Sequence, residues 1–117
     1  MTAEEIKKRY LVPVSILQEY EQLSICRKKK DENGVLQYDD SDLERISLML
    51  TLHGIGFDTE ETLVYMEKLL AGRSTQAERI LMLEQKRGKL LDEIHDREHQ
   101  ISKVDYLRHQ LRGAKET

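Results

Sequence analysis

The sequence has one cysteine, one proline, one phenylalanine and no tryptophan among its 117 residues. The single cysteine, Cys26, excludes an intramolecular disulfide and any metal site built from cysteine pairs. Five tyrosines are the only other aromatic residues, so the hydrophobic core must be thin and made mainly of Leu, Ile and Val. No apolar run approaches the length of a membrane span, and the polar, acidic N-terminus is unlike a signal peptide. We therefore expect a small cytoplasmic protein that does not contact membranes.

The sequence also lacks the motifs of common enzymes. It contains no glycine-rich phosphate loop, no nucleophile motif and no pair of catalytic carboxylates. His95 and His99 lie four residues apart and could share a metal ion, but no third ligand is spaced with them and a solvated pair is far more common. Cys26 is expected to be a small apolar residue rather than a redox switch. We expect no enzymatic activity, no cofactor and no metal site.

Charge gives no direct support for nucleic-acid binding. The formal net charge is −3, whereas affinity for DNA comes from Lys and Arg that neutralise phosphates. The basic residues do cluster, at residues 7–9 and 27–30, but residues 1–39 hold seven Lys or Arg against seven Asp or Glu. The N-terminal part is therefore neutral as a whole.

Two short helices joined by a tight turn are predicted at the N-terminus. Thr2 followed by Glu5 is a capping signal for a helix that ends near Tyr10, and Pro13 is suited to the start of a second helix over residues 13–23. The residues expected to face inward are Ile6, Val14, Leu17 and Tyr20. The residues expected to face outward are Ser15, Gln18, Glu19 and Gln22. This is the outline of a helix-turn-helix, although such pairs more often serve only as packing.

A β-hairpin is predicted next. Asn33-Gly34 lies between the extended segments 25–28 and 35–38, which is a strong hairpin signal. A hairpin directly after a helix-turn-helix would form a wing, and its first strand would carry Arg27 and three lysines toward DNA phosphates. The alternative is a solvated edge strand in which Lys prevents aggregation.

Two more helices follow, and then a long one. The residues after Asp39 and Asp58 show helical periodicity, which ends at Gly54 and Gly72 respectively. The expected core positions are Leu43, Ile46, Met49, Leu50, Leu63, Tyr65, Met66, Leu69 and Leu70. We predict a division at Gly72 into a DNA-binding head of residues 1–72, a dimerisation helix of residues 74–112 and a tail of residues 113–117.

The long helix has heptad spacing, which is typical of a coiled coil. Its repeat positions are Ile80, Leu83, Arg87, Leu90, Ile94, Arg97, Ile101, Val104, Arg108 and Leu111. This stripe would extend about 48 Å at roughly 1.5 Å per residue, which is too long for the small head to cover. The simplest partner is a second copy of the same helix, whereas the alternative is a helix that packs back on its own head. The predicted fold is mainly α, with a winged helix-turn-helix head and an antiparallel coiled-coil dimer.

The order of these elements resembles the MerR family of bacterial transcription regulators over essentially the whole chain. The segments that carry the resemblance are residues 12–21 (VPVSILQEYE), 33–38 (NGVLQY), 42–46 (DLERI) and 56–61 (GFDTEE). The chain departs from the family where the second helix usually has a phosphate-contacting Arg and Tyr, since it has Gln18 and Glu19 there. Leu36 replaces an Arg of the wing. A glutamate at position 19 would repel a nearby DNA phosphate. We therefore expect weaker affinity for the DNA backbone than the resemblance implies.

The residues expected to bind DNA are Ser15, Gln18, Tyr20, Arg27, Lys28, Lys29, Lys30 and Tyr38. The residues expected to form the dimer are Ile80, Leu83, Leu90, Ile94, Ile101, Val104 and Leu111. The resemblance implies a homodimer that binds a near-palindromic promoter with an overlong spacer and bends and untwists it so that RNA polymerase reads both elements. The alternative is a MerR-like scaffold protein that has lost specific DNA binding, as Gln18, Glu19 and Leu36 could suggest.

Overall fold

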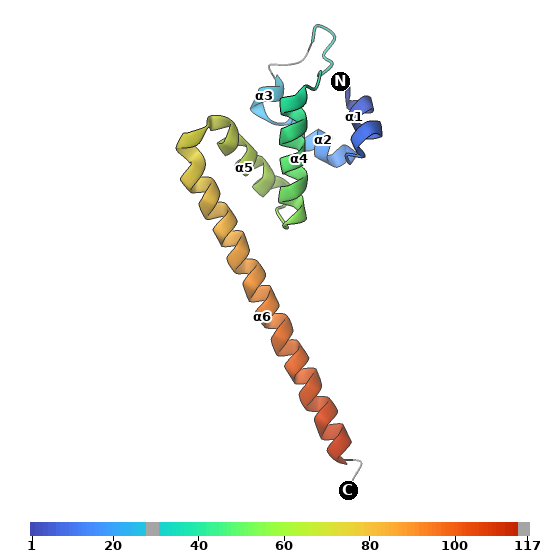
Figure 1. Cartoon of the computed structure of the whole chain (residues 1–117), viewed down its shortest axis with the longest axis vertical. Helices are drawn as coiled ribbons and strands as arrows, with labels where there is room; N and C mark the ends of the chain where they lie inside the picture. Colours follow the sequence, from blue (N-terminus) through green and yellow to red (C-terminus); the bar gives the residue numbers. More distant parts are fainter. Residues whose placement is uncertain (28–30, 115–117) are drawn as a thin grey trace. The chain divides into compact units, whose positions relative to one another are not determined.

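The computed structural model describes residues 1–27 and 31–114 and is mainly helical (Figure 1). The helices are α1 (Ala3–Tyr10), α2 (Val14–Glu21), α3 (Ser24–Arg27), α4 (Asp40–Gly54), α5 (Thr59–Ala71) and α6 (Gln76–Ala114), with a 3-10 turn at Arg73–Thr75 before α6. The chain forms two compact units, Met1–Met82 and Leu83–Thr117, whose boundary falls within α6. The division of functions at Gly72 stays a prediction. In the part of the chain described, no helix is long and apolar enough to cross a membrane.

Three helix starts are fixed by side-chain caps, as predicted. The Thr2 hydroxyl accepts a hydrogen bond from the Glu5 amide at 3.3 Å and begins α1. Capping boxes begin α4 and α5, formed by Asp39 with Asp42 and by Asp58 with Glu61. These caps satisfy amide groups that have no partner inside the helix.

The turn between α1 and α2 is short. Leu11 adopts a left-handed conformation, with φ of 54°, and its amide bonds to the Lys7 carbonyl at 3.1 Å to close α1. Pro13 is the residue before α2, one position earlier than predicted, and Val12 between them is buried. Because the left-handed residue turns the chain sharply, α2 can begin after only three intervening residues.

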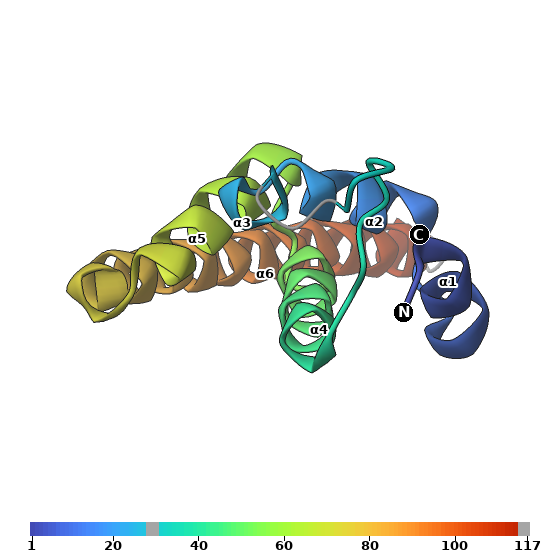
Figure 2. The same cartoon turned by 90° about the horizontal axis from the view of Figure 1, so that it is seen from above.

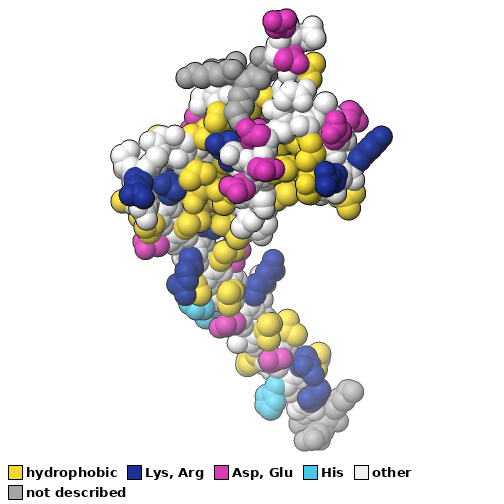
Figure 3. Space-filling view, turned by 45° about the horizontal axis from the view of Figure 1, so that its top comes forward, with side chains coloured by type: hydrophobic (Ala, Val, Ile, Leu, Met, Phe, Trp, Pro, Cys, Tyr) yellow, Lys and Arg dark blue, Asp and Glu magenta, His cyan; other side chains and the backbone are white. Residues whose placement is uncertain are grey.

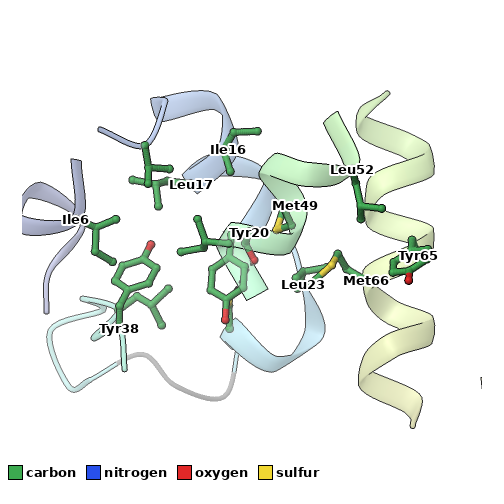
Figure 4. Close-up of a cluster of buried hydrophobic side chains, with 14 of the residues drawn as sticks. Ile6, Ile16, Leu17, Tyr20, Leu23, Tyr38, Met49, Leu52, Tyr65 and Met66 are labelled. Carbon is green, nitrogen blue, oxygen red and sulfur yellow. Dashed lines mark hydrogen bonds between the residues drawn. The ribbon is translucent and has the colours of Figure 1, made fainter. Parts of the chain in front are cut away.

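The core of the first unit joins α1, α2, α4 and α5 (Figure 4). Helix α2 contacts α3, α4 and α5, while α1 and α5 lie on opposite sides of α4 in both Figure 1 and Figure 2. The predicted inward residues Ile6, Leu17 and Tyr20 are buried. Val14 was predicted to be buried but is 49% exposed, because it lies in the first turn of α2 on the outward face; Leu50 of α4 is also exposed.

The predicted wing is not found in the described residues. Ile25, Cys26 and Arg27 were expected in a strand but belong to α3. The reason is a remote contact: Glu67 of α5 accepts bonds from the amide and the hydroxyl of Ser24, at 2.7 and 2.9 Å, and so caps the first residue of α3. Neither residues 1–27 nor 31–38 contain a β-strand, and Leu36 forms an isolated bridge. Residues 28–30, the rest of the predicted basic strand, lie outside the described residues.

The turn signal itself was correct. Gly34 has a φ of 76°, and its amide bonds to the Asp31 carbonyl at 2.9 Å. The Asp31 side chain also accepts bonds from the amides of Asn33 and Val35, at 2.9 and 2.8 Å. Asn33-Gly34 therefore forms a tight turn, organised by an aspartate side chain.

Polar side chains fix the corner between α5 and α6. The Thr75 hydroxyl bonds to the carbonyls of Lys68 and Gly72, and the Arg79 guanidinium donates to Thr75 at 3.1 Å. Helix α6 then continues to Ala114, so the first two residues of the predicted tail are helical. None of the residues of Gln76–Ala114 is buried.

Candidate nucleic-acid interface

Helix α2 presents a polar face to solvent. Ser15, Gln18 and Gln22 are exposed, as predicted, and Glu21 is exposed beside them. These positions recur every three to four residues, so they line one side of the helix. This face offers hydroxyl and amide groups for hydrogen bonding and the carboxylate of Glu21, but no positive charge.

Glu19 does not belong to this face, contrary to the sequence prediction. Its side chain is buried, with only 6% of the residue exposed. One carboxylate oxygen lies 2.6 Å from Nε2 of His53, in the last turn of α4, and the other accepts a hydrogen bond from the hydroxyl of Thr59, the first residue of α5. Glu19 therefore joins α2 to two other helices and is not part of the exposed face of α2.

Tyr20 is completely buried. Its hydroxyl donates a hydrogen bond to the Asp42 carboxylate, and the Arg45 guanidinium lies 3.4 Å from the same Asp42 oxygen and 3.5 Å from the Tyr20 hydroxyl. Burial, with the hydrogen bond to Asp42, raises the pKa of Tyr20 above its ordinary value. In the isolated chain Tyr20 thus fixes α2 on α4 and presents no surface of its own.

Tyr38 is also buried and packs on Tyr20, with 6.0 Å between ring centroids. Its backbone pairs with Met1: the N-terminal ammonium group donates to the Tyr38 carbonyl at 2.8 Å, and the Tyr38 amide donates to the Met1 carbonyl at 2.7 Å. Burial and the negative charge of Glu21 raise the pKa of Tyr38. This residue anchors the N-terminus of the chain to the segment before α4.

Only one of the four basic residues predicted to contact DNA phosphates lies among the described residues. Arg27 ends α3, while Lys28, Lys29 and Lys30 lie outside the described residues. Leu36, at the position where the resemblance places a wing arginine, is buried with 6% exposure. Leu36 therefore packs in the core, and its side chain is not part of the exposed surface.

A second basic group occupies the last turn of α1. It consists of Lys7, Lys8 and Arg9, of which Lys8 and Arg9 are exposed. The Arg9 guanidinium lies 5.8 Å from the ring centre of Tyr10, which is itself 47% exposed. These charges belong to the same unit as α2.

The histidine pair lies on α6. His95 and His99 border a shallow hollow of about 190 Å³ together with Glu98 and Ser102. Throughout residues 1–27 and 31–114, no group of three or more His, Cys, Asp or Glu side chains is arranged to hold a metal ion. The pair is thus an exposed feature of one helix face.

The short α1–α2 pair, its tight turn and the exposed polar face of α2 define a helix-turn-helix protein. Residues 1–69 match the MerR HTH family regulatory protein family, which is more than half of the chain. The chain belongs to the MerR family of DNA-binding transcription regulators.

One solved structure shares the fold. It is a MerR family transcriptional regulator from Bacillus thuringiensis, with 18% sequence identity and a TM-score of 0.58. The alignment covers 90% of this chain and 93% of that one, so the likeness extends beyond the head over most of α6. No curated protein matches the chain.

Proposed function

We propose that the protein binds a near-palindromic promoter site as a homodimer and distorts the DNA between its two half-sites. The observation that carries the proposal is the exposed polar face of α2, held by buried contacts in a MerR-type head. Ser15 and Gln18 are the side chains suited to base edges, since hydroxyl and amide groups read donor and acceptor patterns in the major groove.

We assign the contacts with DNA phosphates to the basic residues that follow α2 in the sequence. Arg27, Lys28, Lys29 and Lys30 are consecutive in the sequence and supply the positive charge that α2 lacks. Contacts with phosphates set affinity and register, whereas contacts with bases set specificity. Tyr20 and Tyr38, buried in the isolated chain, act in this proposal by positioning α2 and the segment before α4.

The dimer rests on the apolar stripe of α6. All seven aliphatic positions predicted for the interface are exposed in the single chain, by 37% for Leu83 up to 68% for Leu111. Exposed aliphatic side chains at heptad spacing favour a partner helix. Two-fold symmetry would present two α2 helices to two half-sites, and straining the DNA between them would adjust the promoter for RNA polymerase.

A scaffold protein without specific DNA binding remains the second candidate. It rested on three departures from the family pattern, and two of these, Glu19 and Leu36, are buried in the core. Packing in the core therefore explains these two residues, and they are no evidence that a DNA contact has been lost. Gln18 alone is an exposed departure, and an amide can read a base directly.

The test is a mobility-shift titration with the DNA upstream of the protein's own gene, at low and moderate salt, against unrelated DNA of equal length. We expect tighter binding to the upstream DNA and a steep loss of affinity with salt. Gln18→Ala should reduce the preference between the two DNAs. Equal binding to both, or no binding in either salt, would favour the scaffold protein.

A further inference from the structure

The ten heptad positions of α6 form a seam that includes three arginines. All ten are exposed in the single chain, and Arg87, Arg97 and Arg108 interrupt the aliphatic positions at intervals of ten and eleven residues. Figure 3 shows Lys or Arg side chains among hydrophobic side chains along α6. An arginine in a coiled-coil seam weakens it unless a carboxylate of the partner lies beside it. The positions of the arginines therefore restrict how two α6 helices can pair.

Parallel pairing places each seam residue opposite its own copy. Arg87 would face the partner's Arg87, and the same would hold for Arg97 and Arg108. Three layers of like charge would then lie in one interface, and each would oppose association. Antiparallel pairing avoids this, but it allows several registers that differ by one heptad.

We propose that the antiparallel pair of α6 helices, already expected from the resemblance, adopts the one register that centres the seam between His95 and Asp96, with every seam arginine facing an aliphatic residue and flanked by a carboxylate of the partner. The layers pair Ile80 with the partner's Leu111, Leu83 with the partner's Arg108, Arg87 with the partner's Val104, Leu90 with the partner's Ile101, and Ile94 with the partner's Arg97. Two-fold symmetry repeats each layer on the other half of the seam, so all ten positions are used.

Charge complementarity supports this register. In an antiparallel pair, the residues that flank each layer are those next to the facing seam residue, and these carry the ion pairs between helices. Arg87, opposite the partner's Val104, then lies beside the partner's Asp105. In the same way Arg108 lies beside the partner's Glu84, because Glu84 follows Leu83 in the sequence.

The central arginine is matched as well. Arg97 faces the partner's Ile94 and lies beside the partner's Glu93. Arg97 bonds to Gln100 at 3.0 Å within its own helix, and Arg108 lies 3.5 Å from Asp105, so these side chains already lie along the helix flanks. Each seam arginine would thus have one carboxylate of the partner beside it.

The neighbouring registers lack this match. A shift of one heptad in one direction sets Arg87 opposite the partner's Arg97. A shift of one heptad in the other direction places Arg87 beside the partner's Arg112 and leaves Gln100 of the partner subunit, which has no charge, beside Arg97. Both shifts also leave seam positions at one end of α6 unpaired. The arginines therefore select one register at some cost in apolar contact, a role attested for single polar residues in coiled coils.

Disulfide cross-linking tests the register, which rests on the proposed homodimer. Leu90→Cys and Ile101→Cys are made in separate full-length chains, mixed in equal amounts and oxidised. We expect a cross-linked dimer in the mixture and none when either variant is oxidised alone. The matched control is a mixture of Ile94→Cys and Val104→Cys, which would face each other only in a register shifted by one heptad, and it should give no cross-link. Buried Cys26 is common to every chain and is tested by oxidising the wild type.

Sedimentation of the same variants separates the two hypotheses. Cross-linking of Leu90→Cys with itself would show parallel helices, and cross-linking of the Ile94→Cys and Val104→Cys mixture would show the shifted register. Either result, or a dimer that gives no cross-link in any mixture, overturns the proposed register and leaves the homodimer in place. A monomer in sedimentation overturns both. Since the seam residues are exposed in the single chain, the variants should keep their helical circular dichroism.

Discussion

The carboxylate of Glu19 lies 2.6 Å from Nε2 of His53, and this contact joins the helix with the exposed polar face to the end of α4. The same carboxylate accepts the Thr59 hydroxyl at the start of α5. A position that the sequence assigned to the DNA-facing surface is thus a buried connection between three helices. Changes at Glu19 should act on the stability of the head before they act on DNA contacts.

Glu19→Ala should therefore lower the free energy of unfolding. The variant leaves His53 and Thr59 without their shared acceptor and removes packed volume, for which we expect a loss of about 1–3 kcal/mol. Urea denaturation followed by circular dichroism measures it. Gln18→Ala is the matched control, because it is exposed on the same helix and should leave stability unchanged.

Glu19→Tyr reverses an expectation drawn from sequence alone. Because the resemblance places a tyrosine at this position of the second helix, the substitution would be expected on that ground to tighten DNA binding, but a tyrosine cannot occupy the buried position of Glu19 without displacing neighbours. We expect a less stable head and weaker DNA binding. Tighter binding with unchanged stability would show that α2 can turn its buried side outward.

Tyr20 should make stability depend on alkaline pH. Its pKa in the folded protein is raised above the ordinary value of 10.0, first by burial and then by the hydrogen bond to Asp42. In the unfolded chain the phenol ionises near that ordinary value, so the stabilisation is complete below it and is lost as pH rises further. The buried Tyr38 contributes in the same direction.

Urea denaturation at several values between about pH 8 and pH 11 tests this dependence. Tyr20→Phe should cost about 1–3 kcal/mol at neutral pH, because it removes a donor to buried Asp42, and it should flatten the alkaline loss. Tyr106→Phe, at an exposed position of α6, is the control and should change neither. An unchanged alkaline slope in Tyr20→Phe would show that other groups control it.

The features that the sequence predicted well depend on neighbours in the chain. Thr2, Asp39 and Asp58 cap helices through residues three positions away, and Asn33-Gly34 forms its turn with Asp31. The exposed stripe of α6 likewise follows from local periodicity. Residue type and spacing were sufficient in each case.

The features that the sequence missed depend on distant partners. Glu19 is buried because His53 and Thr59, 34 and 40 residues away, supply hydrogen bonds to it. Ser24 begins a helix in place of a strand because Glu67 caps it from α5. Ile16 and Leu23, three residues before and four residues after Glu19, are apolar and share its side of the helix, and this signal could have suggested burial. The sequence could not show that His53 and Thr59 bond to Glu19, because these residues become neighbours only in the folded chain.

Replacing Lys28, Lys29 and Lys30 with Ala should weaken binding to every DNA sequence. Each phosphate contact that is lost should lower the slope of affinity against salt by about one unit. Fluorescence anisotropy at several salt concentrations gives both the affinity and the slope. The matched change on α1, Lys8→Ala with Arg9→Ala, shows whether the other basic group contributes. An unchanged slope in the triple variant would contradict the assignment of phosphate contacts to these lysines.

Leu90→Glu combined with Ile94→Glu should convert the proposed dimer to a monomer. The change places like charges in the seam of α6 and removes two aliphatic contacts. Sedimentation at micromolar concentration measures it. His95→Glu with His99→Glu adds the same charge to the same turns but outside the seam, and should remain dimeric. Dissociation of both variants to the same extent would point to general charge repulsion instead of the seam.

Asp42 couples the stability of α2 to that of α4, and this coupling affects DNA binding. One of its oxygens accepts the Asp39 amide at 2.8 Å and caps α4, while the other accepts the Tyr20 hydroxyl from α2. Fraying of α2 would therefore uncap α4, so the amide hydrogens of both helices should exchange with solvent as one cooperative unit. Helix α2 is then preorganised: its ordering entropy is lost during folding, and little of it remains to oppose association with a promoter.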